Sequence, residues 1–150
     1  MIRLVILEIS VVAVSALLGA GVYEQTVLDP AWPAKPSIVR PAEGGVSRKR
    51  FWVPGNITVV LALLASVWAS WLDARSRLAS IIALALFLVI NAVTVLYFAP
   101  AVLSVERDGI EADALASRRW VALSRLRTPL ALGVVVSLAV AVLLLANTMR

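Results

Sequence analysis

The sequence lacks two residue types on which much enzyme chemistry depends, since its 150 residues include no cysteine and no histidine. Without cysteine the chain has no disulfide, no thiolate nucleophile and no thiolate metal ligand. Without histidine it lacks the commonest metal ligand and the commonest general base. The sequence thus predicts no metal site and no bound cofactor, and it leaves acid–base chemistry to other side chains.

Charged residues are also scarce, at 15% of the chain, whereas 61% is hydrophobic and the mean hydropathy is +0.95. Residues 51–72, 78–99 and 128–149 contain no charged side chain, and residues 4–23 contain only Glu8. A helix that crosses a bilayer needs about 20 apolar residues, and these runs lack the two-residue alternation of a membrane β-barrel. We therefore predict an all-α integral membrane protein in contact with the lipid bilayer. Residues 1–150 would form one four-helix bundle, with transmembrane helices at about 3–23, 53–72, 78–99 and 128–147.

The first apolar run has the alternative of being a cleaved signal peptide. Arg3 and the small residues at 15–21 fit such a segment. However, Glu8 lies inside the apolar region, and the run is longer than the usual ~7–15 residues. We therefore expect it to be the first membrane helix.

The connections between the predicted helices differ in length. The prolines at positions 30, 33 and 36 each lack a backbone donor, so they predict an irregular connection over 24–50. Residues 73–77 are too few for anything but an antiparallel hairpin. The last connection mixes acidic and basic residues and predicts an amphipathic helix at 112–125. The two longer connections lie on one face, where a functional site would be built.

Basic residues concentrate in the two long connections. These connections hold ten lysines and arginines, and the opposite side holds four. The ten are Lys35, Arg40, Arg48, Lys49, Arg50, Arg107, Arg118, Arg119, Arg125 and Arg127; the four are Arg3, Arg75, Arg77 and Arg150. Cytoplasmic loops are enriched in such residues, so we expect both long connections to be cytoplasmic and the protein to lie in a bacterial cytoplasmic membrane. The net charge of +5 is then explained by membrane topology and lipid contact, and nucleic acid is not an expected partner.

Two glutamates stand at or inside the first apolar run. Glu8 lies about one turn beyond Arg3, and a carboxylate in a membrane helix is costly, so an interfacial ion pair between them is one interpretation. Tyr23 and Glu24 end the predicted helix. Glu24 either marks the water boundary or faces into the mouth of the bundle, where it would serve as an acid or base.

Polar and aromatic residues elsewhere allow both structural and functional interpretations. Asn56 is either a helix cap or a ligand contact. Asn91, with Thr94, Tyr97 and Phe98 on or beside the same face, either bonds another helix or contacts a substrate. Five tryptophans, Trp32, Trp52, Trp68, Trp71 and Trp120, fit an interfacial belt, and those on the long-connection side also fit the walls of a pocket. Arg125 and Arg127 are either anchors at the membrane surface or stabilisers of a substrate oxyanion.

Several short motifs together resemble a known family. They are Gly21-Val22-Tyr23-Glu24, Pro30-Ala31-Trp32, Phe51-Trp52-Val53-Pro54, Thr94-Val95-Leu96-Tyr97-Phe98-Ala99-Pro100, and Trp120 with Leu123 and Arg127. The chain resembles the small four-helix membrane proteins of the anthrone oxygenase-like domain of unknown function family. The resemblance implies oxidation of an anthrone to a quinone in aromatic polyketide biosynthesis, without a recognised metal or flavin. The absence of histidine departs from any mechanism in which histidine removes the proton.

The leading hypothesis is therefore a membrane-embedded enzyme that acts on a lipophilic polycyclic or polyketide-like molecule. The reaction would be either cofactor-independent oxygenation or an acid–base cyclisation or isomerisation. Its catalytic residues would be Glu24 as the base and Tyr23, Asn91, Tyr97 and Arg127 as donors to an enolate. Its substrate-binding residues would be Trp32, Trp52, Asn56, Thr94, Phe98 and Trp120.

The alternative from a different class is a non-catalytic membrane subunit or lipid-binding scaffold. Its interior polar residues would only hold the helices together. A transporter or channel fits less well, because four helices are few for alternating access and no broken helix pair is apparent. Assembly into a homo-oligomer remains open.

Overall fold

A computed structural model describes residues 1–32, 34–100 and 114–149 of the chain. Within these residues the elements are helices, and four are long and apolar enough to cross a membrane. Their cores are α1 (Ile2–Tyr23), α3 (Arg48–Ala69), α4 (Ala74–Val93) and α7 (Arg127–Thr148). The protein is thus an all-α integral membrane protein with a four-helix bundle, as predicted.

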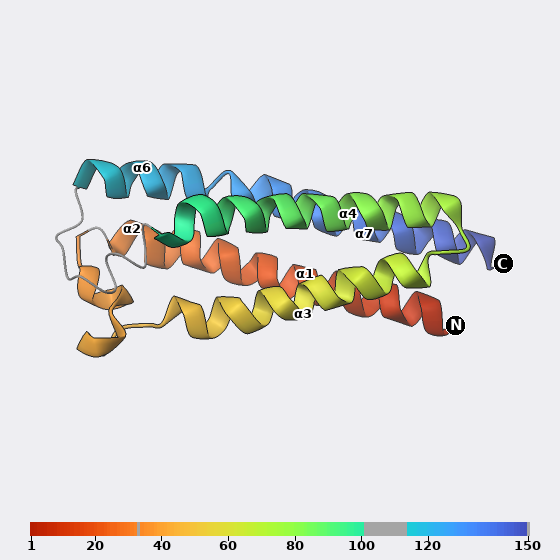
Figure 1. Cartoon of the computed structure of the whole chain (residues 1–150), viewed down its shortest axis with the longest axis horizontal. Coiled ribbons are helices and arrows are strands. Elements are labelled where there is room, and N and C mark those ends of the chain that lie inside the picture. Colours follow the sequence, from red (N-terminus) through yellow and green to blue (C-terminus); the bar gives the residue numbers. More distant parts are fainter. Residues whose placement is uncertain (33, 101–113, 150) are drawn as a thin grey trace.

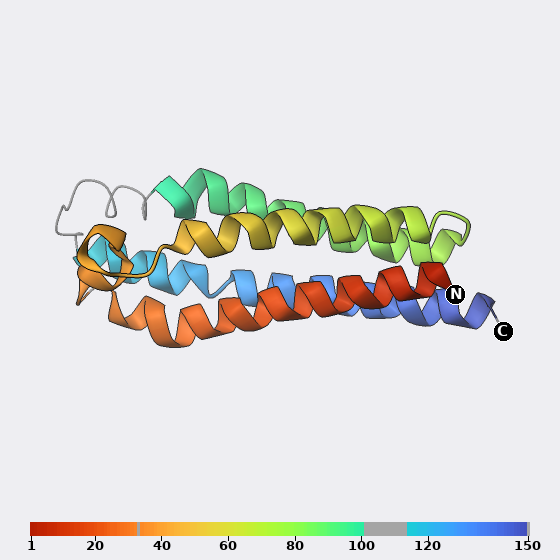
Figure 2. The ribbon, with the colours of Figure 1, turned by 90° about the horizontal axis from the view of Figure 1, so that it is seen from below.

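The four helices run side by side along the long axis of the molecule (Figures 1 and 2). Helix α7 packs against α4 and α1, and α3 packs against α1 and α4, so the helices form a ring. Both termini and the short α3–α4 connection lie at one end (Figure 1). The opposite end, which we call the long-connection end, carries α2 (Asp29–Ala31), α6 (Ala114–Ser124) and the short 3₁₀ segments η2 (Pro36–Val39) and η3 (Pro41–Glu43).

The first helix continues beyond its expected end at Tyr23. A π-helical turn, η1 (Glu24–Leu28), leads directly into α2. The backbone N–H of Asp29 donates to the carbonyl of Glu24, five residues earlier, which is the bonding pattern of a π-helix. Pro30 lacks an N–H and cannot donate a helical hydrogen bond, but the helix continues past it through η1 and α2. The irregular connection therefore begins only after α2.

Helix α4, the third of the four long helices, also ends in a π-helical turn before a proline. Helix α4 runs into the π-helical turn η4 (Thr94–Phe98), which ends just before Pro100. The N–H of Ala99 donates to the carbonyl of Thr94. The two π-helical turns both lie toward the long-connection end, where α1 and α4 lead into the long connections.

The other boundaries differ by a few residues from those expected. Helix α3 begins at Arg48, before the expected start at 53, and it contains Pro54. Helix α4 begins earlier than 78 because the Asp73 carboxylate caps it, accepting from the backbone N–H of Ser76 at 2.7 Å. Helix α6 covers most of the amphipathic helix expected at 112–125, of which 112 and 113 lie outside the described residues.

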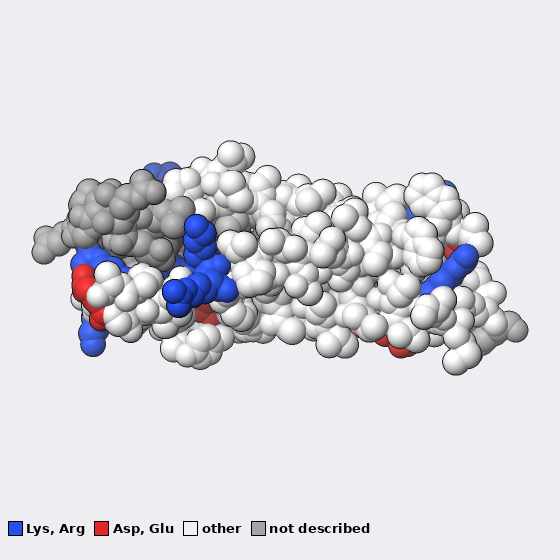
Figure 3. All heavy atoms as spheres, turned by 60° about the horizontal axis from the view of Figure 1, so that its bottom comes forward, with Lys and Arg blue, Asp and Glu red and all other residues white. Residues whose placement is uncertain are grey.

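The interior of the bundle is a column of aliphatic side chains with one aromatic ring. Its buried members are Leu7, Val14, Val59, Leu63, Ala79, Ala83, Phe87, Val134, Leu138, Ala141 and Leu145. Large apolar side chains are exposed along the middle of the outer surface, and charged side chains on the face in Figure 3 gather toward the two ends. Glu8 is exposed on α1, and the expected ion pair between Glu8 and Arg3 is not formed.

Candidate functional site

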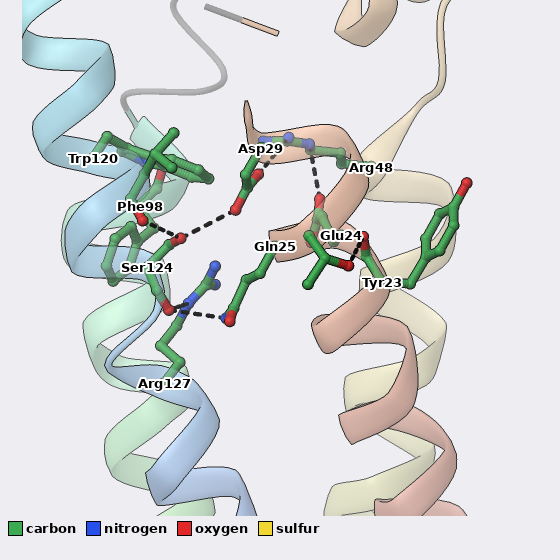
Figure 4. A network of polar contacts seen from close by, with 11 residues as sticks. Tyr23, Glu24, Gln25, Asp29, Arg48, Phe98, Trp120, Ser124 and Arg127 are labelled. Carbon is green, nitrogen blue, oxygen red and sulfur yellow. Dashed lines mark hydrogen bonds and ion pairs between the residues drawn. The ribbon is translucent and has the colours of Figure 1, made fainter. Parts of the chain in front are cut away.

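Three charged side chains meet inside the long-connection end (Figure 4). The Arg48 guanidinium lies between two carboxylates, with Nε 2.8 Å from Glu24 Oε1 and an Nη2 hydrogen bond of 2.9 Å to Asp29 Oδ1. The Arg48 Nε–H is not aligned for a hydrogen bond to Glu24, so that contact is an ion pair only. Glu24 is 7% exposed and Asp29 is fully buried. We call Glu24, Asp29, Arg48 and Arg127 the charge cluster.

The π-helical turn explains why Glu24 and Asp29 face the same partner. In an α-helix, residues three or four apart share a face, and residues five apart do not. The η1 turn bonds each residue to the fifth one along, so it brings positions 24 and 29 to one side. Arg48 then reaches both from the first turn of α3.

Hydrogen bonds tie the charge cluster to the C-terminal half of the chain. The hydroxyl of Ser124, at the end of α6, donates to Asp29 Oδ2 at 3.0 Å. Gln25 Nε2 donates to the Ser124 carbonyl at 3.0 Å, and the Thr128 hydroxyl donates to Gln25 Oε1. These bonds join the end of the first helix to α6 and α7 (Figure 4).

Aromatic rings cover the cluster. Trp120 lies edge-on to both Trp32 and Phe98, with ring centroids 5.6 and 5.5 Å apart, and its indole N–H donates to the Phe98 carbonyl. The Arg48 guanidinium carbon lies 5.4 Å from the Trp120 ring, and that of Arg127 lies 4.5 Å from the Phe98 ring. Both cations therefore gain cation–π contacts in a site shielded from water.

The charges of the cluster balance, with two carboxylates and two guanidiniums. Arg127 donates from Nε to the Ser124 carbonyl at 3.3 Å. Among the described residues, no carboxylate lies within 4.0 Å of it. A neutral sum lowers the cost of burial, although the desolvation of buried ion pairs still offsets much of their attraction. The indole N–H of Trp32 is buried beside the cluster, and no hydrogen-bond acceptor for it lies among the residues that the structure describes.

A groove of about 340 Å³ opens beside the cluster, between the end of α4 with η4 and the α6–α7 junction. Its wall is formed by Ile90, Val93, Tyr97, Phe98, Leu123, Leu126, Arg127 and Leu130. This volume is at the lower end of the ~300–1,000 Å³ typical of small-molecule sites. Phe98, which belongs to the aromatic cover, and Arg127, which belongs to the charge cluster, both line the groove and so connect it to the cluster.

Five of the predicted site residues meet at this end of the bundle. They are Glu24, Trp32, Phe98, Trp120 and Arg127. Two more lie next to it: Tyr97 contributes to the groove wall, and Trp52 lies beside Gly21 of α1 with its side chain close to the Glu24 carboxylate.

Four predicted site residues do not join the cluster. Tyr23 is 58% exposed, and its ring points away from the cluster (Figure 4). The other three satisfy their polar groups on their own helices. Asn91 donates to the Phe87 carbonyl, Thr94 to the Ile90 carbonyl and Asn56 to the Trp52 carbonyl. Asn56 is therefore not a cap, and Asn91 makes no bond to another helix among the described residues.

Five residues of the site were not identified as candidates from sequence, namely Gln25, Asp29, Arg48, Ser124 and Thr128. Asp29 is an acidic residue directly before a proline, but its spacing of five residues from Glu24 does not predict a shared face in an α-helix. Arg48 stands in a run of three basic residues. That run suggested topology, and nothing in it distinguishes the inward-facing member.

Comparison with family models, curated proteins and solved structures finds no match to this chain. Among the described residues, no group of three or more carboxylate side chains is placed to hold a metal ion. Functional inference therefore rests on the geometry of the cluster and the groove.

Proposed function

We propose that the protein is a membrane-embedded enzyme that transfers a proton to or from a neutral lipophilic substrate at the charge cluster. The observation that supports this most is the burial of three charged side chains, Glu24, Asp29 and Arg48, next to the half-buried Arg127 and a groove in an otherwise apolar bundle. Ionisable groups inside membrane proteins are costly and commonly mark functional sites. π-Helical turns also occur frequently at such sites, and one of them carries Glu24.

The charge balance of the cluster favours a neutral substrate. An anionic ligand would add an uncompensated negative charge to a buried site whose charges already sum to zero. A neutral ketone or phenol adds none. If Glu24 removes its proton, the negative charge moves from the carboxylate to the substrate oxygen, and the sum stays at zero.

In the proposed reaction, a carboxylate oxygen of Glu24 takes a proton from an acidic C–H of the substrate. The electron pair of that C–H bond moves to the conjugated carbonyl, and Arg127 stabilises the resulting enolate oxygen. For cofactor-independent oxygenation, molecular oxygen is the oxidant, and a CH₂ group plus O₂ gives a carbonyl plus water. For an isomerisation or cyclisation, the enolate instead accepts a proton or forms a bond at another carbon.

The substrate class follows from the surroundings of the cluster. Tyr97 and Phe98 line the groove together with aliphatic side chains and Arg127, and Trp32 and Trp120 pack with Phe98 over the cluster. These features fit a polycyclic or polyketide-like molecule that enters from the bilayer, as the family resemblance implies. Glu24 and Arg127 remain in their predicted roles, whereas Tyr23 and Asn91 have no role in the proposal.

Anthrone is a suitable probe, since its methylene group is a carbon acid next to an aromatic ketone system. The purified protein in nanodiscs would be incubated with anthrone in D₂O under argon, and exchange of the methylene hydrogens followed by NMR. We expect wild-type protein and the control Glu8→Gln to accelerate exchange, and Glu24→Gln to lose about 10²-fold of that rate. No acceleration over empty nanodiscs would contradict the proposal. Oxygen uptake in air then separates oxygenation from isomerisation.

The second candidate is a non-catalytic membrane subunit or lipid-binding scaffold. One observation favours it: Arg48 contacts both carboxylates, and Ser124 also donates to Asp29, so the cluster resembles a clamp between the helices. In that case Glu24→Gln changes stability or assembly and leaves the turnover of a reconstituted pathway unchanged.

We also propose that the long-connection end faces the cytoplasm of a bacterial cell. The excess of lysine and arginine in the long connections supports this orientation. Labelling a cysteine introduced at Lys35, which is exposed, with a membrane-impermeant maleimide tests it. Labelling should occur only after the cells are opened, while a cysteine at Arg75 should react in intact cells.

A further inference from the structure

The first turn of α3 carries three consecutive cations, Arg48, Lys49 and Arg50. The N-terminus of a helix has a partial positive charge, so cations are unfavourable there and anions are favourable. The turn contains no acidic residue that would compensate them. Arg48 is turned inward and is neutralised by Glu24 and Asp29. Lys49 and Arg50 are exposed, and among the described residues neither has a carboxylate within 4.0 Å.

The aromatic residues that follow place this turn at the edge of the membrane. Phe51 is 52% exposed, and its ring stands edge-on to Trp52 at 5.3 Å between centroids. Aromatic side chains concentrate where lipid headgroups meet the hydrocarbon. In Figure 3, lysine and arginine side chains gather where the apolar trunk meets the long-connection end. We therefore expect the cations of the turn to lie at the level of the lipid phosphate groups.

We infer that Lys49 and Arg50 bind the phosphate of an anionic phospholipid, with Phe51 packed against its acyl chains. The lipid supplies the negative charge that the first turn of α3 lacks, and each basic residue near an anionic membrane surface adds to the attraction. Because Arg48 belongs to the same turn, the bound lipid also stabilises the charge cluster. Lipid binding at this turn does not require catalysis, and it is measured as a change in the stability of the protein.

The test compares protein in nanodiscs of phosphatidylcholine with protein in nanodiscs that also contain phosphatidylglycerol. Circular dichroism gives the thermal midpoint, and native mass spectrometry gives the lipids retained after release. For wild type, we expect phosphatidylglycerol to raise the midpoint by roughly 5 °C and to be retained preferentially. The variant Lys49→Gln/Arg50→Gln should lose both effects. Inorganic phosphate added to phosphatidylcholine nanodiscs should not reproduce them.

The matched control is Arg3→Gln/Arg75→Gln, which removes two cations from the opposite end. It should respond to phosphatidylglycerol as wild type does. An equal response in Lys49→Gln/Arg50→Gln would overturn the inference, and so would an equal loss in the control, because attraction would then be nonspecific. If the double variant fails to fold, each single variant should lose part of the midpoint shift. Single variants that both retain the full shift would also overturn it.

Discussion

The two ends of the bundle hold their helices together with different polar groups. At the end with the termini, Ser70, Ser76 and Ser80 are fully buried and form a chain of hydroxyls. Ser76 also donates to the Ala141 carbonyl at 2.9 Å, which joins α4 to α7. At the long-connection end, the helices are joined by ion pairs of Arg48 with Glu24 and Asp29.

This contrast shows that neutral hydroxyl groups can join the helices of this fold without charged side chains. Hydroxyls bonded to one another or to a carbonyl are neutral, and their burial costs little once they are paired. Buried ion pairs carry a desolvation cost that their attraction only partly offsets. Since neutral groups suffice at one end, the charges at the other end call for an additional explanation. We propose that they serve proton transfer.

The largest effect should come from Arg48→Met, which leaves two buried carboxylates without their shared cation. Removal of one partner from a buried pair typically costs about 3–5 kcal/mol, so we expect severe destabilisation or failure to accumulate. The measurement is reversible unfolding in mixed micelles. Arg75→Met, at an exposed position of the other end, is the control and should unfold like wild type.

Asp29→Asn should have a smaller effect. The amide keeps the shape of the side chain and an acceptor for Ser124, but it removes the charged partner of Arg48. We expect a loss of about 1–3 kcal/mol with the fold retained by circular dichroism. A variant as stable as wild type would show that Glu24 alone neutralises Arg48.

Ser76→Ala tests the neutral end. It removes one hydroxyl that bonds both Ser70 and Ala141. Interhelical hydrogen bonds in membrane proteins average about 0.6 kcal/mol and reach about 1.7, so the loss should stay below that of Asp29→Asn. If Ser76→Ala proved the more damaging of the two, the contrast between the ends would be wrong.

The smallest effect should come from Glu8→Gln. Glu8 is exposed on α1 and has no ion pair with Arg3. Substitutions away from buried networks usually change stability by less than about 0.5 kcal/mol. Equal unfolding midpoints for Glu8→Gln and wild type would confirm that a carboxylate in the first helix affects stability through its burial and not through its presence alone.

The fold could be predicted from sequence because runs without charges leave few alternatives to membrane helices. The ends of the helices could not be predicted as well. Pro30 and its neighbours predicted that the first helix ends near residue 23, whereas a π-helical turn carries that helix past Pro30. The spacing of apolar residues does not reveal where a turn widens. The alignment of Glu24 with Asp29 was therefore not predictable.

The candidate site was predictable only in part. Glu24 and Arg127 stood out because they are charged at the edges of apolar runs. Asn91 and Thr94 stood out for the same polarity, but their side chains bond the preceding turn of their own helix. Sequence cannot separate such local bonds from bonds between helices. Arg48 has basic neighbours, and only the folded structure shows which of the three turns inward.

The most direct test of the central claim is the triple variant Glu24→Gln/Asp29→Asn/Arg48→Met. Uncharged replacement of the three buried ion-pair partners avoids their desolvation cost, and the Arg127 left in place is only partly buried, so the variant should fold and unfold with a midpoint near that of wild type. We predict that it nevertheless fails to accelerate hydrogen exchange in anthrone. A stable triple variant that accelerates exchange as wild type does would contradict the claim and leave the charge cluster with a structural role alone.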